Sequence, residues 1–206
     1  MNIVLKNGDK LSLTEGATCA MAAAAISEGL ARGAVAAKVN GRTVDLSTPL
    51  AEGDALEIVT LKDPEGLAIY RHTCAHVLAQ AIKTIYPTSK LAIGPTIENG
   101  FYYDIDFVTP ITQDDLAKIE SEMTKIIKSD LPLERFTLPR SEALALMSKY
   151  QEKYKVELIQ DLPEGETISF YKQGGFVDLC RGPHLPSTGK IKAFKLTGIA
   201  GAYWRG

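Results

Sequence analysis

The first 60 residues alternate short apolar runs with turn signals. Two pairs of apolar runs flank Asn7-Gly8-Asp9 and Asn40-Gly41, a pattern typical of β-hairpins. Between them, the alanine-rich stretch 17–30 predicts a helix that ends near Gly33, and residues 56–59 alternate as a closing strand. The order β-β-α-β-β-β predicts a small β-grasp, ubiquitin-like sheet with one helix across it.

A change of pattern at residues 62–66 predicts a domain boundary. This stretch combines charges, a proline and a glycine without a hydrophobic anchor, which is typical of a linker. From Leu67 to Tyr86, apolar side chains recur at spacings of three and four, so we expect a core-facing helix ended by Pro87. The predicted domains are therefore residues 1–62 and 63–206.

The rest of the second domain alternates predicted strands with predicted helices. We expect a helix after Thr112 and another at 141–150. Strands are predicted at 90–97, 101–107, 133–138, 155–159, 168–172, 176–180 and 191–196. Strands with a few helices on one face predict an α+β domain around an antiparallel sheet.

Composition narrows the class of protein. The hydrophobic fraction of 45% and charged fraction of 23% are those of an ordinary globular chain. A net charge of -2 and a pI near 6.0 give no overall basic footprint for nucleic acid. Three widely spaced cysteines favour a reducing compartment. With neither a signal peptide nor a membrane-length apolar run, we expect a cytoplasmic protein.

All three histidines of the chain lie in two short motifs. Arg71-His72-Thr73-Cys74-Ala75-His76 places His72 and His76 one turn apart on one face of the predicted helix. Asp178-Leu179-Cys180-Arg181-Gly182-Pro183-His184 holds the third histidine beside a cysteine. We therefore expect His72, His76, Cys180 and His184 to surround one pocket.

Three interpretations of this constellation stay open on the residues alone. Three imidazoles and a thiolate form a ligand set that zinc accepts, although the spacing is not that of a zinc finger. The same groups can instead activate water without a metal, because histidine titrates near neutrality. The third interpretation makes the histidines structural hydrogen-bonding residues. Cys19 and Cys74 occupy apolar helix positions, so we assign them to core packing.

Several long motifs together resemble the N-terminal region of bacterial threonyl-tRNA synthetases. They are the two histidine motifs, Gly94-Pro95-Thr96-Ile97-Glu98-Asn99-Gly100-Phe101-Tyr102-Tyr103-Asp104, and the closing Gly201-Ala202-Tyr203-Trp204-Arg205-Gly206. The resemblance implies a TGS domain, a β-grasp module, followed by an editing domain shared in outline with alanyl-tRNA synthetases.

The resemblance implies hydrolytic editing of seryl-tRNA(Thr). A synthetic site for threonine excludes serine poorly, since one methyl group is worth only about 1–3 kcal/mol. A second site would then remove serine from the tRNA while rejecting threonine by size. Zinc at the four-residue cluster is an alternative, and no cofactor is needed for editing by water alone.

The resemblance also implies roles for individual residues. His72 or Lys155 would deprotonate the attacking water, with His76, Cys180 and His184 in the same pocket. Tyr103 and Asp178 would line the amino-acid site, Asp178 meeting the substrate ammonium. A nucleophilic Cys180 ranks below direct water attack.

Structural alternatives apply to three of these residues. Lys155 can be a solvated strand lysine, Tyr103 a core aromatic, and Asp178 a sheet-edge acid that pairs with Arg181.

The resemblance places the synthetic core after Gly206, with its ATP, magnesium and zinc sites and the contacts of the parent homodimer. We therefore expect a fragment that binds tRNA(Thr) carrying serine, without membrane contact, but cannot ligate threonine. A non-catalytic tRNA-binding or zinc-stabilised module is the rival interpretation. Editing of alanyl-tRNA is a third.

Overall fold

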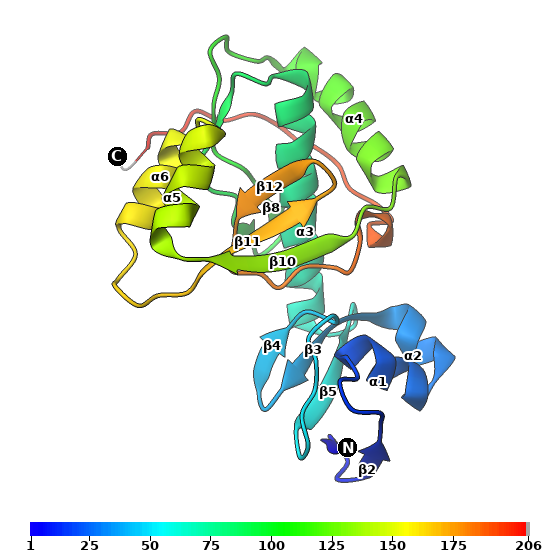
Figure 1. Ribbon diagram of the computed structural model, residues 1–206. Helices are drawn as coiled ribbons and strands as arrows, with labels where there is room; N and C mark the ends of the chain where they lie inside the picture. Colours follow the sequence, from blue (N-terminus) through cyan, green and yellow to red (C-terminus); the bar gives the residue numbers. More distant parts are fainter. Residues whose placement is uncertain (205–206) are drawn as a thin grey trace. The chain divides into compact units, whose positions relative to one another are not determined.

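The computed structural model describes residues 1–204, and Figure 1 traces their path. They form two compact units: one contains Met1–Arg71 and Gly182–Pro186, the other His72–Arg181 and the segment from Ser187 onward. The segment 201–206 quoted for the resemblance extends two residues beyond the described part of the chain. Within that described part, no helix is both long and apolar enough to cross a membrane.

The first unit contains a five-stranded sheet of order β2-β1-β5-β3-β4. β1 and β5 run parallel, and the other pairs are antiparallel. The strands are β1 Asn2–Leu5, β2 Lys10–Ser12, β3 Ala34–Val39, β4 Arg42–Val44 and β5 Ala55–Thr60. Both turn signals hold, because Gly8, Asn40 and Gly41 adopt positive φ. The predicted β-grasp order is confirmed.

The single helix predicted across this sheet is divided in two, α1 Cys19–Ile26 and α2 Glu28–Gly33. Ser27 is extended (φ -168°, ψ 153°), and its hydroxyl accepts the backbone N–H of Leu30 at 3.1 Å. A serine cap at this position stabilises a new helix start, which the alanine-rich composition did not reveal. Cys19 and the small alanines of α1 lie in the core of this unit.

The long histidine helix is confirmed as α3, Pro64–Ile85. It begins earlier than expected, so the prediction that residues 64–66 belong to a linker is wrong. The backbone oxygen of Asp63 accepts the N–H of Leu67 at 3.2 Å, and proline suits the first turn of a helix because it needs no donor there. The domain boundary after residue 62 stays a prediction.

The second unit is organised around an antiparallel sheet of order β10-β11-β12. Its strands are β10 Leu133–Leu138, β11 Ile168–Gln173 and β12 Phe176–Leu179. α5, Arg140–Lys149, and α6, Lys153–Gln160, pack their apolar side chains on one face, on a core that includes Phe170. This α+β architecture confirms the predicted fold class (Figure 1).

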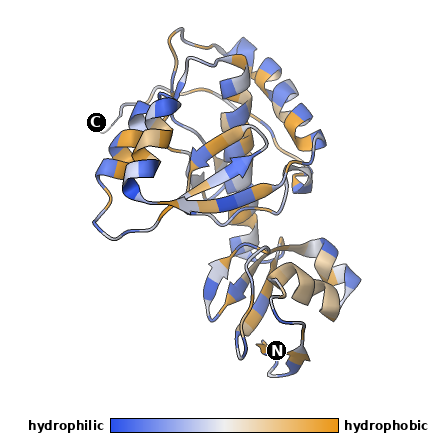
Figure 2. Ribbon diagram, in the orientation of Figure 1, coloured by the Kyte–Doolittle hydropathy of each residue, from blue (hydrophilic) through white to orange (hydrophobic). Residues whose placement is uncertain are grey.

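Another helix, α4 Leu116–Lys128, follows a short 3-10 turn, η1 Gln113–Asp115, as the sequence predicted. Thr112 and Asp115 form a capping box at this start. Figure 2 shows apolar and polar positions distributed around α4. The apolar ones include Ile119 and Met123, which are buried.

Four strand predictions in the second unit are wrong or too long. Residues 155–159 lie in α6, where Lys155 and Ile159 are buried one turn apart. The predicted strands 90–97 and 101–107 shrink to the pairs β6 Lys90–Leu91 with β9 Ile105–Asp106, and β7 Thr96–Ile97 with β8 Gly100–Phe101. Residues 191–196 form no strand and follow the 3-10 turn η2 Thr188–Lys190.

Candidate active site

In the second unit, the two-residue period of strand β12 and the helical period of α3 bring polar side chains toward each other. Alternation along β12 and the residue after it places Asp178 and Cys180 on the sheet face opposite Phe170. On α3, residues four apart share a face, and the thiol of Cys180 lies 3.5 Å from Nε2 of His72. This face of the sheet therefore meets the histidine face of α3.

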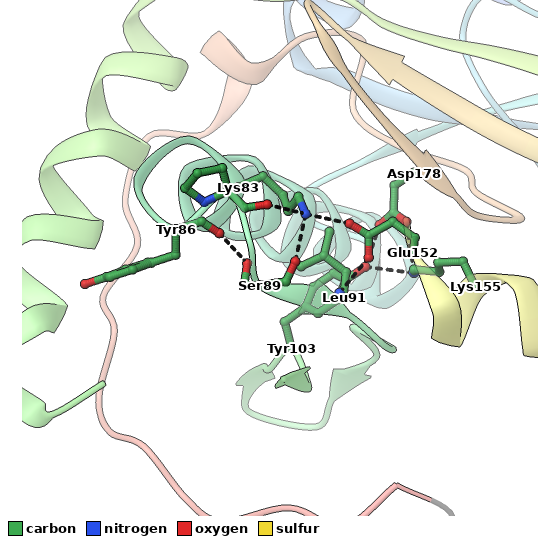
Figure 3. Close-up of polar contacts among 9 residues, drawn as sticks. Lys83, Tyr86, Ser89, Leu91, Tyr103, Glu152, Lys155 and Asp178 are labelled. Carbon is green, nitrogen blue, oxygen red and sulfur yellow. Dashed lines mark hydrogen bonds and ion pairs between the residues drawn. The ribbon is translucent and has the colours of Figure 1, made fainter. Parts of the chain in front are cut away.

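A closed triangle of hydrogen bonds lies on this side of the sheet. Nζ of Lys155 lies 2.9 Å from Oδ1 of Asp178 and donates to the Tyr103 hydroxyl at 2.9 Å. The Tyr103 hydroxyl in turn donates to Oδ2 of Asp178 at 2.5 Å. The side chains of Lys155 and Asp178 are only 4% and 2% exposed. Figure 3 shows the three residues approaching from separate segments.

His76 lies beside this triangle. Its Nε2 is 3.7 Å from Oδ2 of Asp178, and its ring meets that of His72 edge to face at a centroid distance of 5.1 Å. Burial lowers the pKa of His76 well below its ordinary value of 6.5, and the nearby His72 and Lys155 act in the same direction. His76 is therefore a neutral imidazole at physiological pH, with one donor and one acceptor.

Tyr103 is held as a neutral phenol. Burial raises its pKa well above 10.0, and the neighbouring Asp178 carboxylate raises it further. Its ring also packs against Gly94, where a Cβ atom would lie 2.3 Å from Cδ2 of the ring. The absence of a side chain at position 94 is therefore what admits the ring.

The four residues predicted to share a pocket lie together. One ligand atom from each of His72, His76, Cys180 and His184 lies within 4.8 Å of the other three. A tetrahedral zinc with bonds of about 2.0–2.3 Å sets its donors about 3.3–3.8 Å apart, so a small contraction would complete such a site. The nitrogen and sulfur donor set fits zinc chemically.

The structural alternatives for Lys155 and Asp178 are wrong in their details. Lys155 is a buried helix residue rather than a solvated strand lysine. Arg181, which we considered as the partner of Asp178, instead bonds to Glu166 at 2.9 Å. Tyr103 is only partly buried, and its hydroxyl bonds to two ionisable groups, which a purely core aromatic would not do.

The two cysteines assigned to core packing are buried as expected. Burial raises the pKa of Cys74 to about 12 and that of Cys19 to about 11, so neither is a thiolate at neutral pH.

Two features of this region escaped the sequence analysis. Glu152 is buried just before α6, and its carboxylate bonds to the ammonium of Lys83 at 2.7 Å. Gln80, one turn beyond His76 on α3, accepts from the amide of Gln173 at 2.5 Å. Gln80 continues the four-residue spacing of the histidines, so this spacing could have predicted that Gln80 lies on the same helix face. Nothing in the local sequence predicts that Glu152 is buried.

Two pockets flank the triangle. One, of about 660 Å³, has Asp178 among its lining residues together with Lys83 and Lys90. The other, of about 620 Å³, has Tyr103 in its wall and continues along Lys195–Ala202. Each of these two pockets therefore has one residue of the triangle among its lining residues.

Comparison with known proteins gives a family match near each end of the chain. Residues 1–60 match the TGS domain, and residues 168–206 match the threonyl and alanyl tRNA synthetase second additional domain. Over all 206 residues the chain is 60% identical to the threonine–tRNA ligase of Acetivibrio thermocellus and 57% identical to that of Clostridioides difficile. The chain corresponds to the N-terminal TGS and editing region of bacterial threonyl-tRNA synthetases.

The match to the second additional domain covers part of the site. Asp178, Cys180 and His184 fall inside the match to the second additional domain, whereas His72 and Lys155 precede it. The chain spans about a third of the length of the ligases it matches, 32% in each of the two named here. Their names describe ligation.

Proposed function

We propose that this chain hydrolyses the ester that joins serine to the 3′ end of tRNA(Thr). The observation that carries the proposal is the buried triangle of Lys155, Asp178 and Tyr103 beside the His72 and Cys180 pair. Burying an ammonium and a carboxylate is costly unless they pair with each other and with further hydrogen-bonding groups, as these two do. The similarity to threonine–tRNA ligases and the match to the second additional domain support an aminoacyl-tRNA as the substrate class.

The reaction forms one bond and breaks another. A water oxygen bonds to the ester carbonyl carbon, the bond from that carbon to the ribose oxygen breaks, and serine and the free 3′ end leave. The water proton passes to a base and then to the ribose oxygen, so no external reductant or oxidant is needed. Because the ester carbonyl develops negative charge, an adjacent cation lowers the barrier.

We assign the base to His72 and the charge stabilisation to Lys155. Nζ of Lys155 lies 2.9 Å from Oδ1 of Asp178 and 2.9 Å from the Tyr103 hydroxyl, and an ammonium has a third N–H that can donate to the developing oxyanion. His72 lies outside this triangle and next to Cys180, where it can accept a proton from water. His76, neutral because of its burial, orients the ring of His72 from the next turn.

Asp178 is the group that we expect to recognise serine. Its carboxylate is the negative charge of the triangle, and the α-ammonium of an aminoacyl ester is attracted to it. Threonine carries the same ammonium and differs by one methyl group. Discrimination must therefore come from steric exclusion beside Asp178, because the favourable binding of a methyl group gives only about 1–3 kcal/mol.

A second candidate function has its own supporting observation. The His72, His76, Cys180 and His184 donors lie close enough for zinc, which would make the site a structural metal centre in a non-catalytic tRNA-binding module. If zinc is bound, those four residues would hold it and it would supply local rigidity and a Lewis acid.

The direct test is release of amino acid from charged tRNA. We expect the chain to free serine from seryl-tRNA(Thr), to leave threonyl-tRNA(Thr) intact, and to act more slowly on alanyl-tRNA. Activity should survive exhaustive chelation in protein shown by elemental analysis to be free of zinc. Loss of activity on chelation, restored by zinc, would replace the metal-free mechanism, and an inactive chain with stoichiometric zinc would favour the binding module.

A further inference from the structure

Glu152 is a buried carboxylate that the proposed mechanism does not use. Its side chain is 7% exposed, and its two oxygens have separate partners. Oε1 lies 2.7 Å from Nζ of Lys83 on α3, while Oε2 accepts the backbone N–H of Leu91 in β6 at 2.8 Å. Figure 3 shows this carboxylate between the two partners, next to Lys155.

The position of Glu152 in the chain links these contacts to the start of α6. The backbone oxygen of Glu152 accepts the N–H of Val156 at 3.0 Å, the first turn of the helix that carries Lys155 three residues further on. Anchoring the Glu152 side chain to α3 and β6 therefore fixes both the origin and the rotation of that first turn.

The Leu91 contact extends the same anchor to Tyr103. Leu91 pairs with Ile105 in the β6 and β9 ladder. The next residue, Ala92, donates to the backbone oxygen of Asp104 at 2.9 Å, so the strand that receives Glu152 is bonded to the residue adjoining Tyr103. One carboxylate thus fixes the two segments whose side chains meet at 2.9 Å, Lys155 and Tyr103.

Lys83 holds the other side of this anchor firmly. Besides Glu152, its ammonium donates to the backbone oxygens of Pro87 at 3.1 Å and Ser89 at 2.7 Å. Three acceptors complete the donor capacity of the ammonium. The ammonium of Lys83 is therefore held in one position, and its ion pair holds the Glu152 carboxylate in place.

We propose that Glu152 is a positioning residue for deacylation, which sets the separation of Lys155 from Tyr103 and Asp178. This inference rests on the proposed hydrolysis of seryl-tRNA(Thr). Because displacement of a reacting group by about 1 Å can cost on the order of a hundredfold in rate, a distant anchor of this kind has a measurable effect on kcat. Substrate affinity should change little, since Glu152 lies outside the set that would meet the amino acid.

The test compares two variants of Glu152 with a matched control. Glu152→Gln keeps an oxygen for Leu91 and loses the ion pair, and Glu152→Ala loses both. The control is Glu120→Gln on α4, because Glu120 also bonds one lysine, Lys195 at 2.9 Å, and one backbone N–H, that of Leu196 at 2.8 Å.

Two measurements are made on each chain. The first is kcat and KM for serine release from seryl-tRNA(Thr). The second is acetylation of the Lys155 amine by an amine-reactive reagent, followed by mass spectrometry, which needs no catalytic activity. We expect Glu152→Gln to lower kcat about tenfold with KM within about twofold, Glu152→Ala to lower kcat further, and both to speed acetylation of Lys155. Glu120→Gln should match the parent chain.

The outcomes separate this inference from the proposed function. Unchanged kcat and unchanged protection of Lys155 in both Glu152 variants would overturn the positioning role. A fall in kcat with Lys155 still protected would also overturn it. If the parent chain releases no serine, the proposed function fails, and protection of Lys155 alone decides whether Glu152 positions it. Should the Glu152 variants fail to fold, Lys83→Gln removes the same ion pair and is judged by the same two measurements.

Discussion

The hydroxyl of Tyr103 donates to Oδ2 of Asp178 at 2.5 Å, across 75 residues of sequence. The other oxygen of the carboxylate lies 2.9 Å from the ammonium of Lys155. A carboxylate only 2% exposed thus has a partner on each oxygen. Since a buried polar group without a partner costs far more than a bond contributes, each member of this triangle depends on the other two.

Tyr103→Phe should weaken both stability and editing. The substitution removes one donor to Asp178 and one acceptor for Lys155 while keeping the ring, so we expect a loss of about 1–3 kcal/mol in the free energy of unfolding. Serine release should fall about tenfold because Lys155 loses a positioning contact. Urea denaturation and a deacylation assay measure the two effects. Tyr102→Phe is the control, since Tyr102 is 42% exposed, and an equal response of both variants would contradict the role of Tyr103.

Lys155→Met should be much more harmful than Lys153→Met on the same helix. Removing the Lys155 ammonium leaves Asp178 buried without its cation, which costs about 3–5 kcal/mol of unfolding free energy. Lys153 pairs with Asp106 at 2.9 Å but is 57% exposed, so its loss should lower the free energy of unfolding far less. Urea denaturation of both variants in the same buffer is the measurement. Equal losses of unfolding free energy in the two variants would show that the buried Lys155 ion pair contributes no more to stability than the exposed Lys153 pair.

Cys180→Ala should retain serine release. If water attacks the ester directly, the thiol only contacts His72, and we expect kcat to stay within about tenfold of the parent value. If Cys180 were the nucleophile, the loss would span several orders of magnitude, and the parent chain would form a seryl thioester. Single-turnover deacylation and mass spectrometry of acid-quenched enzyme distinguish the two cases.

The stability of the metal-free chain should fall below pH 6.5 because of His76. Its pKa is lowered well below 6.5 in the folded state, so below that pH the unfolded chain binds a proton that the folded chain does not. Stability therefore decreases as pH falls, by up to about 1.4 kcal/mol per pH unit from this group. Urea denaturation between pH 7.5 and 5 measures the slope. His76→Gln should flatten it, and an unchanged slope would assign the effect to other groups.

The residues of the site were predictable where their spacing follows a regular period. His72 and His76 lie one helical turn apart, and Asp178 and Cys180 lie two residues apart on a strand, so each pair shares a face wherever the element forms. That the two pairs meet was a hypothesis from the clustering of histidines in two motifs. The first sheet was equally predictable, because Asn40-Gly41 and the alternating strands determine its hairpins.

The remaining parts of the site depend on contacts that no local pattern records. Residues 155–159 alternate as a strand would, but Lys155 and Ile159 are buried on one side of a helix that begins at Lys153. The partner of Glu152 lies on α3, 69 positions earlier in the sequence, at Lys83. Tertiary packing of this kind overrides the local preference for strand, and a single sequence does not show it.

Because Gly94 lies close to the ring of Tyr103, the residue at each of these positions limits which residue the other position can accommodate. Any larger residue at 94 would displace the Tyr103 ring, because its Cβ atom would lie 2.3 Å from the ring, well below the distance of about 3.5–4.0 Å between non-bonded carbon atoms. A chain with alanine at position 94 would need a smaller residue at position 103. It would then lack the hydroxyl that bonds to Asp178 and Lys155. The residue at position 94 therefore determines whether the hydrogen-bonded triangle of Lys155, Asp178 and Tyr103 can form.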